Sequence, residues 1–172
     1  MQMVKRIIGG FFLFILLLWL LAPKQEIYYL LEKKLKENDI IISNETVTDT
    51  WFGLKIQNAD VYVKGVKMAK LSELQLNIFF FYNTLEVSNL TTDEVLHKDV
   101  PKKIEESSII YSVLDPLHVK LDGTGSFGVV EGTVELLEKK VHILFPVAKD
   151  IKALRKFLKK NQTGEWTYET TY

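Results

Sequence analysis

The chain contains no cysteine and three histidines among its 172 residues. The absence of cysteine excludes a disulfide framework, thiol chemistry and a lipoprotein-type acylation site. His97, His118 and His142 have no further ligands at metal-binding spacing, and none lies in a local nucleophile motif. We therefore predict no metal site, no cofactor and no catalytic residues, and hence a protein that is not an enzyme.

An excess of charge of one sign is also lacking, because 22 basic residues balance 22 acidic ones. A neutral chain has no bulk attraction for nucleic acid, so we expect no nucleic-acid partner. The length suits one domain of ordinary size in addition to a short N-terminal element.

One uncharged apolar run, IIGGFFLFILLLWLLA at residues 7–22, dominates the N-terminal region. Lys5 and Arg6 precede it, and Pro23 closes it. A cleaved signal peptide would need a small residue where Leu20 stands, and cleavage directly before Pro23 is unfavourable. We therefore favour an uncleaved membrane anchor.

The same run predicts a transmembrane helix at residues 7–23, because a span needs about 20 apolar residues and flanking charges can reach the interface. The basic residues before it favour a cytoplasmic stub at 1–6 and an exported C-terminal domain. The side chains assigned to the anchor are Ile7, Phe11, Phe14, Leu17, Trp19 and Ala22.

Residues 24–38 follow with the spacing of a juxtamembrane amphipathic helix, which ends at Asn38-Asp39. Its apolar stripe consists of Ile27, Leu30, Leu31 and Leu35. Such a stripe either lies on lipid or covers the end of a sheet, and covering a sheet is the commoner use.

From Ile40 onward, apolar and polar residues alternate with the two-residue period of strands. A phase slip between Ile56 and Ala59 indicates a bulge, and Gly65 marks a turn between two long strands. The aromatic run at 79–82 breaks the alternation, either as an exposed patch or as a strand buried on both faces. We favour burial.

Two further helices are predicted, at 102–108 after Pro101 and at 149–160. The second would carry an apolar stripe made of Ile151, Leu154, Phe157 and Leu158. Its basic side would consist of Lys149, Lys152, Arg155, Lys156, Lys159 and Lys160. This basic face would rest on an anionic membrane or an acidic partner, or else remain solvated while the stripe closes the sheet.

The predicted fold class is therefore mainly β (α+β). The N-terminal transmembrane helix would lead into an exported β-rich domain at 39–172. That domain would be an extended, curved antiparallel sheet covered by one or two amphipathic helices.

Gly123-x-Gly125-x-x-Gly128 matches the letters of a dinucleotide-binding fingerprint. Such a loop must lead from a strand into a helix, whereas here the pattern continues into another strand. The glycines are better explained by turns and bulges, and we predict no nucleotide site.

The layout resembles the AsmA-like group, and within it the type II secretion system protein N family of Gram-negative inner membranes. The residues that carry this resemblance are 23–35 leading to 40–42, then 54–61, and the glycine-marked segments 121–126 and 132–136. The resemblance implies an inner-membrane protein with a periplasmic, curved sheet that serves secretion machinery or lipid handling. Lipopolysaccharide-export bridge proteins have a similar single-span layout.

We predict a non-catalytic, single-pass protein that is a structural or assembly component of an envelope complex and has an envelope protein partner. The alternative is a lipid-binding or lipid-transfer module. A lipid module needs an open apolar concavity, whereas an assembly component needs its sheet faces filled or covered.

Overall fold

The computed structural model describes residues 2–21 and 24–172. It has two α-helices in these ranges, α1 (Gln2–Leu20) and α2 (Lys24–Glu37). Among the described residues, no helix is long and apolar enough to cross a membrane. The predicted anchor residue Ala22 and the end of the predicted span at Pro23 lie outside the described residues, as does the side chain of Trp19.

Strands make up most of the described chain, so the mainly β prediction is confirmed. They are β1 (Ile40–Ser43), β2 (Thr46–Thr50), β3 (Gly53–Val63), β4 (Val66–Phe79), β5 (Tyr82–Thr92), β6 (Lys103–Ser112), β7 (Asp115–Gly125), β8 (Gly128–Glu135), β9 (Lys140–Ala148), β10 (Lys159–Lys160) and β11 (Trp166–Thr171). A short 3-10 helix, η1 (Glu94–Leu96), lies between β5 and β6.

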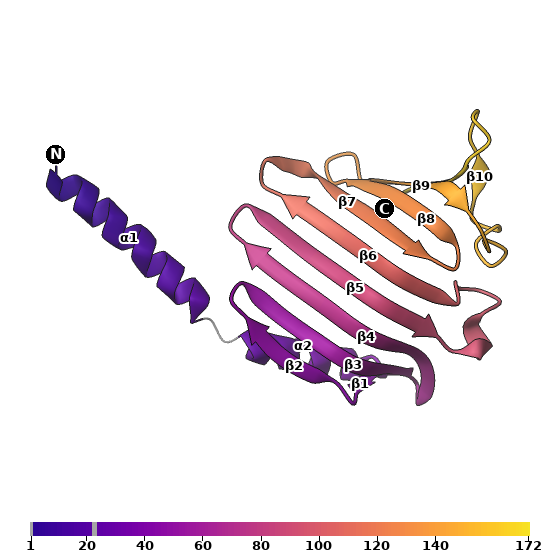
Figure 1. The fold of residues 1–172 in the computed structure, drawn as a ribbon, viewed down its shortest axis with the longest axis horizontal. Helices are drawn as coiled ribbons and strands as arrows, with labels where there is room; N and C mark the ends of the chain where they lie inside the picture. Colours follow the sequence, from indigo (N-terminus) through magenta and orange to yellow (C-terminus); the bar gives the residue numbers. More distant parts are fainter. Residues whose placement is uncertain (1, 22–23) are drawn as a thin grey trace.

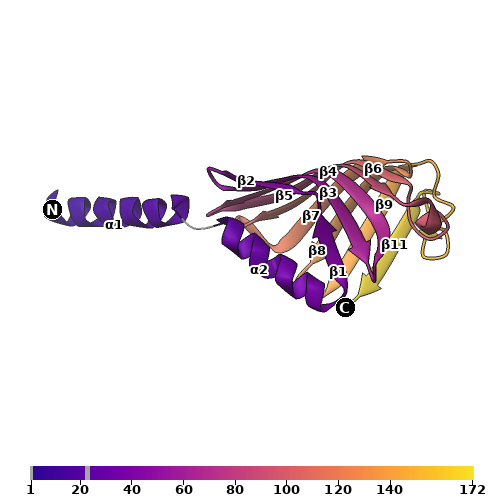
Figure 2. The ribbon, with the colours of Figure 1, turned by 90° about the horizontal axis from the view of Figure 1, so that it is seen from below.

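These eleven strands form one antiparallel sheet across the described residues, in the order β1-β3-β4-β5-β6-β7-β8-β9-β11-β10, with β2 also paired to β3. From β3 to β9, each strand pairs with the next one along the chain (Figure 1). Figure 2 shows that the sheet is curved and that α2 lies against its concave side. The sheet is therefore an open meander with two edges.

Helix α2 packs on the first strands of the sheet through Tyr28, which is buried. Its cluster contains Leu54, Ile56 and Ala59 of β3 and Leu71 of β4. Burial raises the pKa of the Tyr28 hydroxyl. The helix therefore covers one end of the concave face, but not through the predicted stripe: Leu30 and Leu31 are exposed, and the side chain of Ile27 lies outside the described residues.

The predicted phase slip occurs at Asn58, whose backbone adopts a left-handed conformation with φ of 58°. The pairing with β4 keeps its register there, and the shift in register lies between Val61 and Tyr62, so the predicted position of the bulge was wrong. Asn89, on β5, also has a left-handed φ, of 51°. Asparagine tolerates this region better than most residues. As a consequence, Ile56 and Ala59 pack in the same cluster although they are three positions apart.

Two predicted helices are absent from the described residues. Residues 103–112 form strand β6, because Ile109 and Tyr111 pair with β5 and β7 and complete the meander. Residues 149–158 form consecutive turns, and Lys159 and Lys160 pair with β11 as β10. In both segments sheet pairing and packing override the local helical spacing.

The turns at 149–158 still bury most of the predicted apolar stripe. Ile151 is buried with Phe127, Val130 and Phe145, and the partly buried Leu154 and Leu158 pack against this second cluster. Phe157 is exposed, so its assignment to the stripe was wrong. The concave face is thus covered at one end by α2 and near β8 and β9 by these turns.

A buried carboxylate, Asp60 on β3, stabilises the edge of the sheet near α2. Lys67 Nζ lies 2.7 Å from its Oδ1, and Asn44 Nδ2 donates to Oδ2 at 2.9 Å. The hydrogen bond from Lys67, followed by that from Asn44, holds the pKa of Asp60 below its ordinary value of 3.8. The same ion pair raises the pKa of Lys67.

We expect Asp60→Asn to lower the stability of the protein at neutral pH but not in strong acid. Because the folded-state pKa of Asp60 is depressed, its contribution is present above pH 3.8 and is lost as the pH falls through the lower folded value. Urea unfolding of both proteins at about pH 7 and about pH 2.5 measures this difference. A difference that does not change with pH would contradict the ion-pair explanation.

Candidate functional site

One register row of apolar side chains crosses eight neighbouring strands of the sheet. Direct Cα partners along it are Leu54, Leu76, Leu85, Ile109, Leu121, Gly132, Ile143 and Tyr168. Leu54 belongs to the cluster beneath α2, and Leu121 and Ile143 pack against the second cluster. The row therefore lies on the concave face.

Between the two covered regions, the row is half-buried. Leu54 is buried beneath α2, whereas Leu85, Ile109 and Leu121 retain part of their surface. Nine hydrophobic residues are buried in the whole described chain, and no large side chain there is below 2% exposed. A domain of this size normally buries a far larger core. The concave face is consequently an open apolar surface with no second layer over its centre.

The opposite face of the same strands is polar. The neighbouring register row consists of Lys55, Gln75, Glu86, Ser108, Asp122, Glu131, Leu144 and Thr167. Strict alternation of this kind produces a sheet with one apolar and one solvated face. The two faces therefore differ in chemistry along nearly the full width of the sheet.

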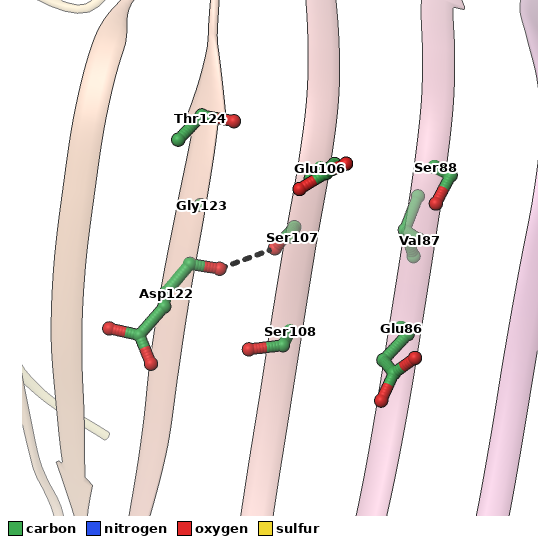
Figure 3. A pocket seen from close by; sticks show the side chains of 9 residues that line it. All are labelled: Glu86, Val87, Ser88, Glu106, Ser107, Ser108, Asp122, Gly123 and Thr124. Carbon is green, nitrogen blue, oxygen red and sulfur yellow. Dashed lines mark hydrogen bonds between the residues drawn. The ribbon is translucent and has the colours of Figure 1, made fainter.

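A shallow hollow on β5, β6 and β7 contains three carboxylates, those of Glu86, Glu106 and Asp122 (Figure 3). The hydrogen bond drawn there runs from Ser107 Oγ to the backbone oxygen of Asp122, at 3.1 Å. Within the described residues, no group of three or more metal-ligating side chains is placed to hold an ion. The hollow is a solvated acidic surface.

The three histidines lie in separate environments. His118 Nδ1 lies 2.6 Å from Asp115, and this hydrogen bond raises the pKa of the His118 imidazole. His97 Nε2 is 3.1 Å from the backbone oxygen of Thr92, and His142 Nε2 is 3.4 Å from Glu169. His118 and Asp115 are both on β7, and His97 lies beside η1. His142 of β9 is paired with Glu169 of β11.

The glycines of the apparent dinucleotide fingerprint lie on strands and not before a helix. Gly123 and Gly125 end β7, and Gly128 begins β8. A Cβ on Gly125 would lie 2.3 Å from the backbone oxygen of Lys103 on β6 and 2.9 Å from the ring of Phe127, which is part of the second cluster. The missing side chains therefore make room for packing on the concave face.

The predicted anchor side chains whose surroundings the structure describes are exposed. Ile7, Phe11, Phe14 and Leu17 lie on α1, which projects away from the sheet (Figure 1). Exposed apolar area on this scale is unusual for a surface in water.

The predicted basic face does not form on one helix. Lys156 pairs with Asp99 at 2.6 Å, and the cationic groups of Arg155 and Lys160 lie over the Trp166 ring at 5.7 and 5.2 Å. Lys149, Lys152 and Lys159 are exposed on the same turns and on β10. Arg155 and Lys160 thus contact Trp166 of β11, and Lys156 contacts the connection between β5 and β6.

Fold and site together define an open, curved antiparallel sheet with one apolar face. Comparison with family models, with curated proteins and with solved structures found no match. The apolar face and α1 are therefore the features from which a function can be inferred.

Proposed function

We propose that this protein is a non-catalytic, membrane-anchored module that holds lipid acyl chains against the concave face of its sheet. The observation that carries the proposal is the half-buried apolar row at Leu85, Ile109 and Leu121, between the region covered by α2 and the region covered by the turns at 149–158; this stretch has no covering layer in the described structure. Of the two roles predicted from the sequence, an open concavity favours the lipid-handling one. Burial of hydrocarbon there would remove apolar surface from water on both partners.

The dimensions and chemistry of the row suit a chain of methylene groups. At about 4.8 Å per strand, a row across eight strands is roughly 34 Å long, and its uncovered middle lies on β5, β6 and β7. Its side chains are aliphatic from Leu54 to Leu121, so that part of the row presents no hydrogen-bonding group. A peptide strand laid across it would leave backbone groups unsatisfied, whereas an acyl chain has none.

The proposed anchor is the apolar segment at 7–22, embedded in the lipid bilayer. Support comes from the exposed side chains of α1 and from Lys5 and Arg6 before it, which favour a cytoplasmic N-terminus. The sheet would then lie on the exported side, in a periplasmic position as the AsmA-like resemblance implies. A topology reporter fused after Tyr172 tests this, and a cytoplasmic signal would contradict it.

Photocrosslinking in intact membranes tests lipid binding directly. We expect a benzophenone amino acid at Leu121, on the concave face, to capture lipid, and the same group at Asp122, on the polar face, to capture none. The two positions are adjacent, so the anchor and the strand are identical in both variants. Equal lipid capture at both positions, or capture at neither, would overturn the proposal.

The assembly role is a second candidate, because one edge of the sheet is open. β10 pairs with β11 at Lys159 and Lys160, and the described strands leave 168–171 without a neighbour on that side. Such an edge accepts a strand from another protein by main-chain hydrogen bonding. Crosslinking from Glu169 in intact membranes would identify an envelope partner.

A further inference from the structure

The two ends of the sheet differ in the chemistry of their turns. Because successive strands are antiparallel, alternate turns lie at the same end. Four turns, those between β2 and β3, β4 and β5, β6 and β7, and β8 and β9, lie at one end. Their apolar residues are Trp51, Phe52, Phe80, Phe81, Val113, Leu114, Leu136 and Leu137. We call these eight residues the apolar rim.

The rim side chains extend into solvent. Leu114 is 89% exposed, Trp51 78%, Leu137 76% and Phe81 61%. Phe79, at the end of β4, connects two rim members, because its ring centroid is 5.0 Å from that of Phe52 and 5.7 Å from that of Phe80. Side chains this large at every turn of one end are not explained by folding, because exposing them gains no burial.

The turns at the other end of the sheet are mostly polar or filled, although Val95 and Phe157 are exposed there. Lys64 and Gly65 join β3 to β4, and the connection at 93–102 carries five charged residues apart from its histidine. Phe127, in the turn between β7 and β8, is buried in the second cluster. The exposed apolar side chains of the turns are thus concentrated at one end of the sheet.

The position of the chain's N-terminal region identifies what the rim faces. α2 runs toward β1, and its first residue lies at the rim end, separated from Leu21 by two residues (Figure 2). Figure 1 also shows α1 beyond the rim end of the sheet. Two carboxylates near the rim are paired within the chain, Glu138 with Lys140 and Asp115 with His118. These pairs reduce the number of isolated charges that would have to approach hydrocarbon.

We propose that the apolar rim docks into the interfacial region of the same bilayer that holds α1. Trp and Phe side chains favour that region, and an apolar edge of this kind enters it by roughly 5–10 Å. The concave face would then open at the lipid surface, with its strands running away from the membrane. This inference rests on the proposed anchoring by α1 and does not depend on acyl-chain binding.

Fluorescent labelling tests the proposal, since the absence of cysteine permits single-cysteine variants of the full chain. Leu114→Cys labels the rim, and Val95→Cys labels the polar end at a residue of similar exposure, 73%. Each variant carries an environment-sensitive nitrobenzoxadiazole dye and is reconstituted into vesicles of phosphatidylcholine with phosphatidylglycerol. Doxyl-labelled phosphatidylcholine then quenches dyes that reach the interface.

We expect quenching of the dye in the Leu114→Cys variant to exceed that in the Val95→Cys variant several-fold, with a blue-shifted emission from the rim dye. Adding Trp51→Glu to the rim-labelled variant should reduce its quenching, and adding Lys98→Glu, at the polar end, should not. Vesicle flotation reports anchoring by α1 separately. Flotation with equal quenching at the two ends would overturn rim docking while leaving the anchor intact, and loss of flotation would overturn the anchoring on which it rests.

Discussion

Ile109→Asp is expected to abolish lipid retention, whereas Ile110→Asp is expected to leave it unchanged. The two isoleucines are adjacent on β6 and face opposite sides of the sheet, because Ile109 pairs with Leu85 and Leu121 in the apolar row. An uncompensated carboxylate against hydrocarbon costs several kcal/mol, so lipid retention should fall by on the order of tenfold or more. Native mass spectrometry of detergent-extracted protein measures the retained lipid.

The neighbouring variant controls for the anchor and for the charge itself. Ile110 is half-buried on the polar face, where a carboxylate remains hydrated. Circular dichroism of both variants would establish that each retains its sheet. If both variants kept their lipid, the bound lipid would belong to α1, and the concave face would not be the binding site.

Gly128→Ala is expected to disrupt the C-terminal half of the sheet. Gly128 has a φ of +102°, and a Cβ there would lie 1.8 Å from the backbone oxygen of Val147. The backbone of β9 cannot withdraw without breaking its pairing with β8. The combined strain and clash should cost about 3 kcal/mol or more, measured by urea unfolding with tryptophan fluorescence.

Gly65→Ala provides the matched control. Gly65 also has a positive φ, of +78°, but a Cβ there would meet open space. It should therefore cost about 1–2 kcal/mol, the penalty of the left-handed conformation alone. Equal losses in the two variants would show that conformation, and not the approach of Val147, limits position 128.

The strands that alternate strictly were predictable, and the segments with mixed signals were not. The alternation of Leu74, Leu76 and Ile78 identified one face of β4, and Gly65 identified its turn. Residues 103–112 also alternate weakly, yet Pro101 and the polar residues favoured a helix. Pairing on both sides decided the outcome, and pairing with distant strands is not a local property of the sequence.

The aromatic run at 79–82 shows why the candidate surfaces were harder to predict than the fold. Burial is the usual place for consecutive phenylalanines, so we expected a strand buried on both faces. Instead, Phe80 and Phe81 form the turn between β4 and β5 and are exposed. The apolar row could not be predicted either, because its members lie far apart in the sequence and are brought side by side only by the pairing register of the strands.

The sequential pairing from β3 to β9 has a consequence for how this architecture varies in size. Each strand depends on its immediate neighbours in the chain, so stability is approximately a sum of adjacent-strand terms, as in repeat proteins. Adding or deleting one hairpin would change the width of the concave face by about 10 Å without altering the remaining contacts. The distance that the sheet extends along the membrane from its anchor is therefore set by hairpin number, a property that can change in whole units.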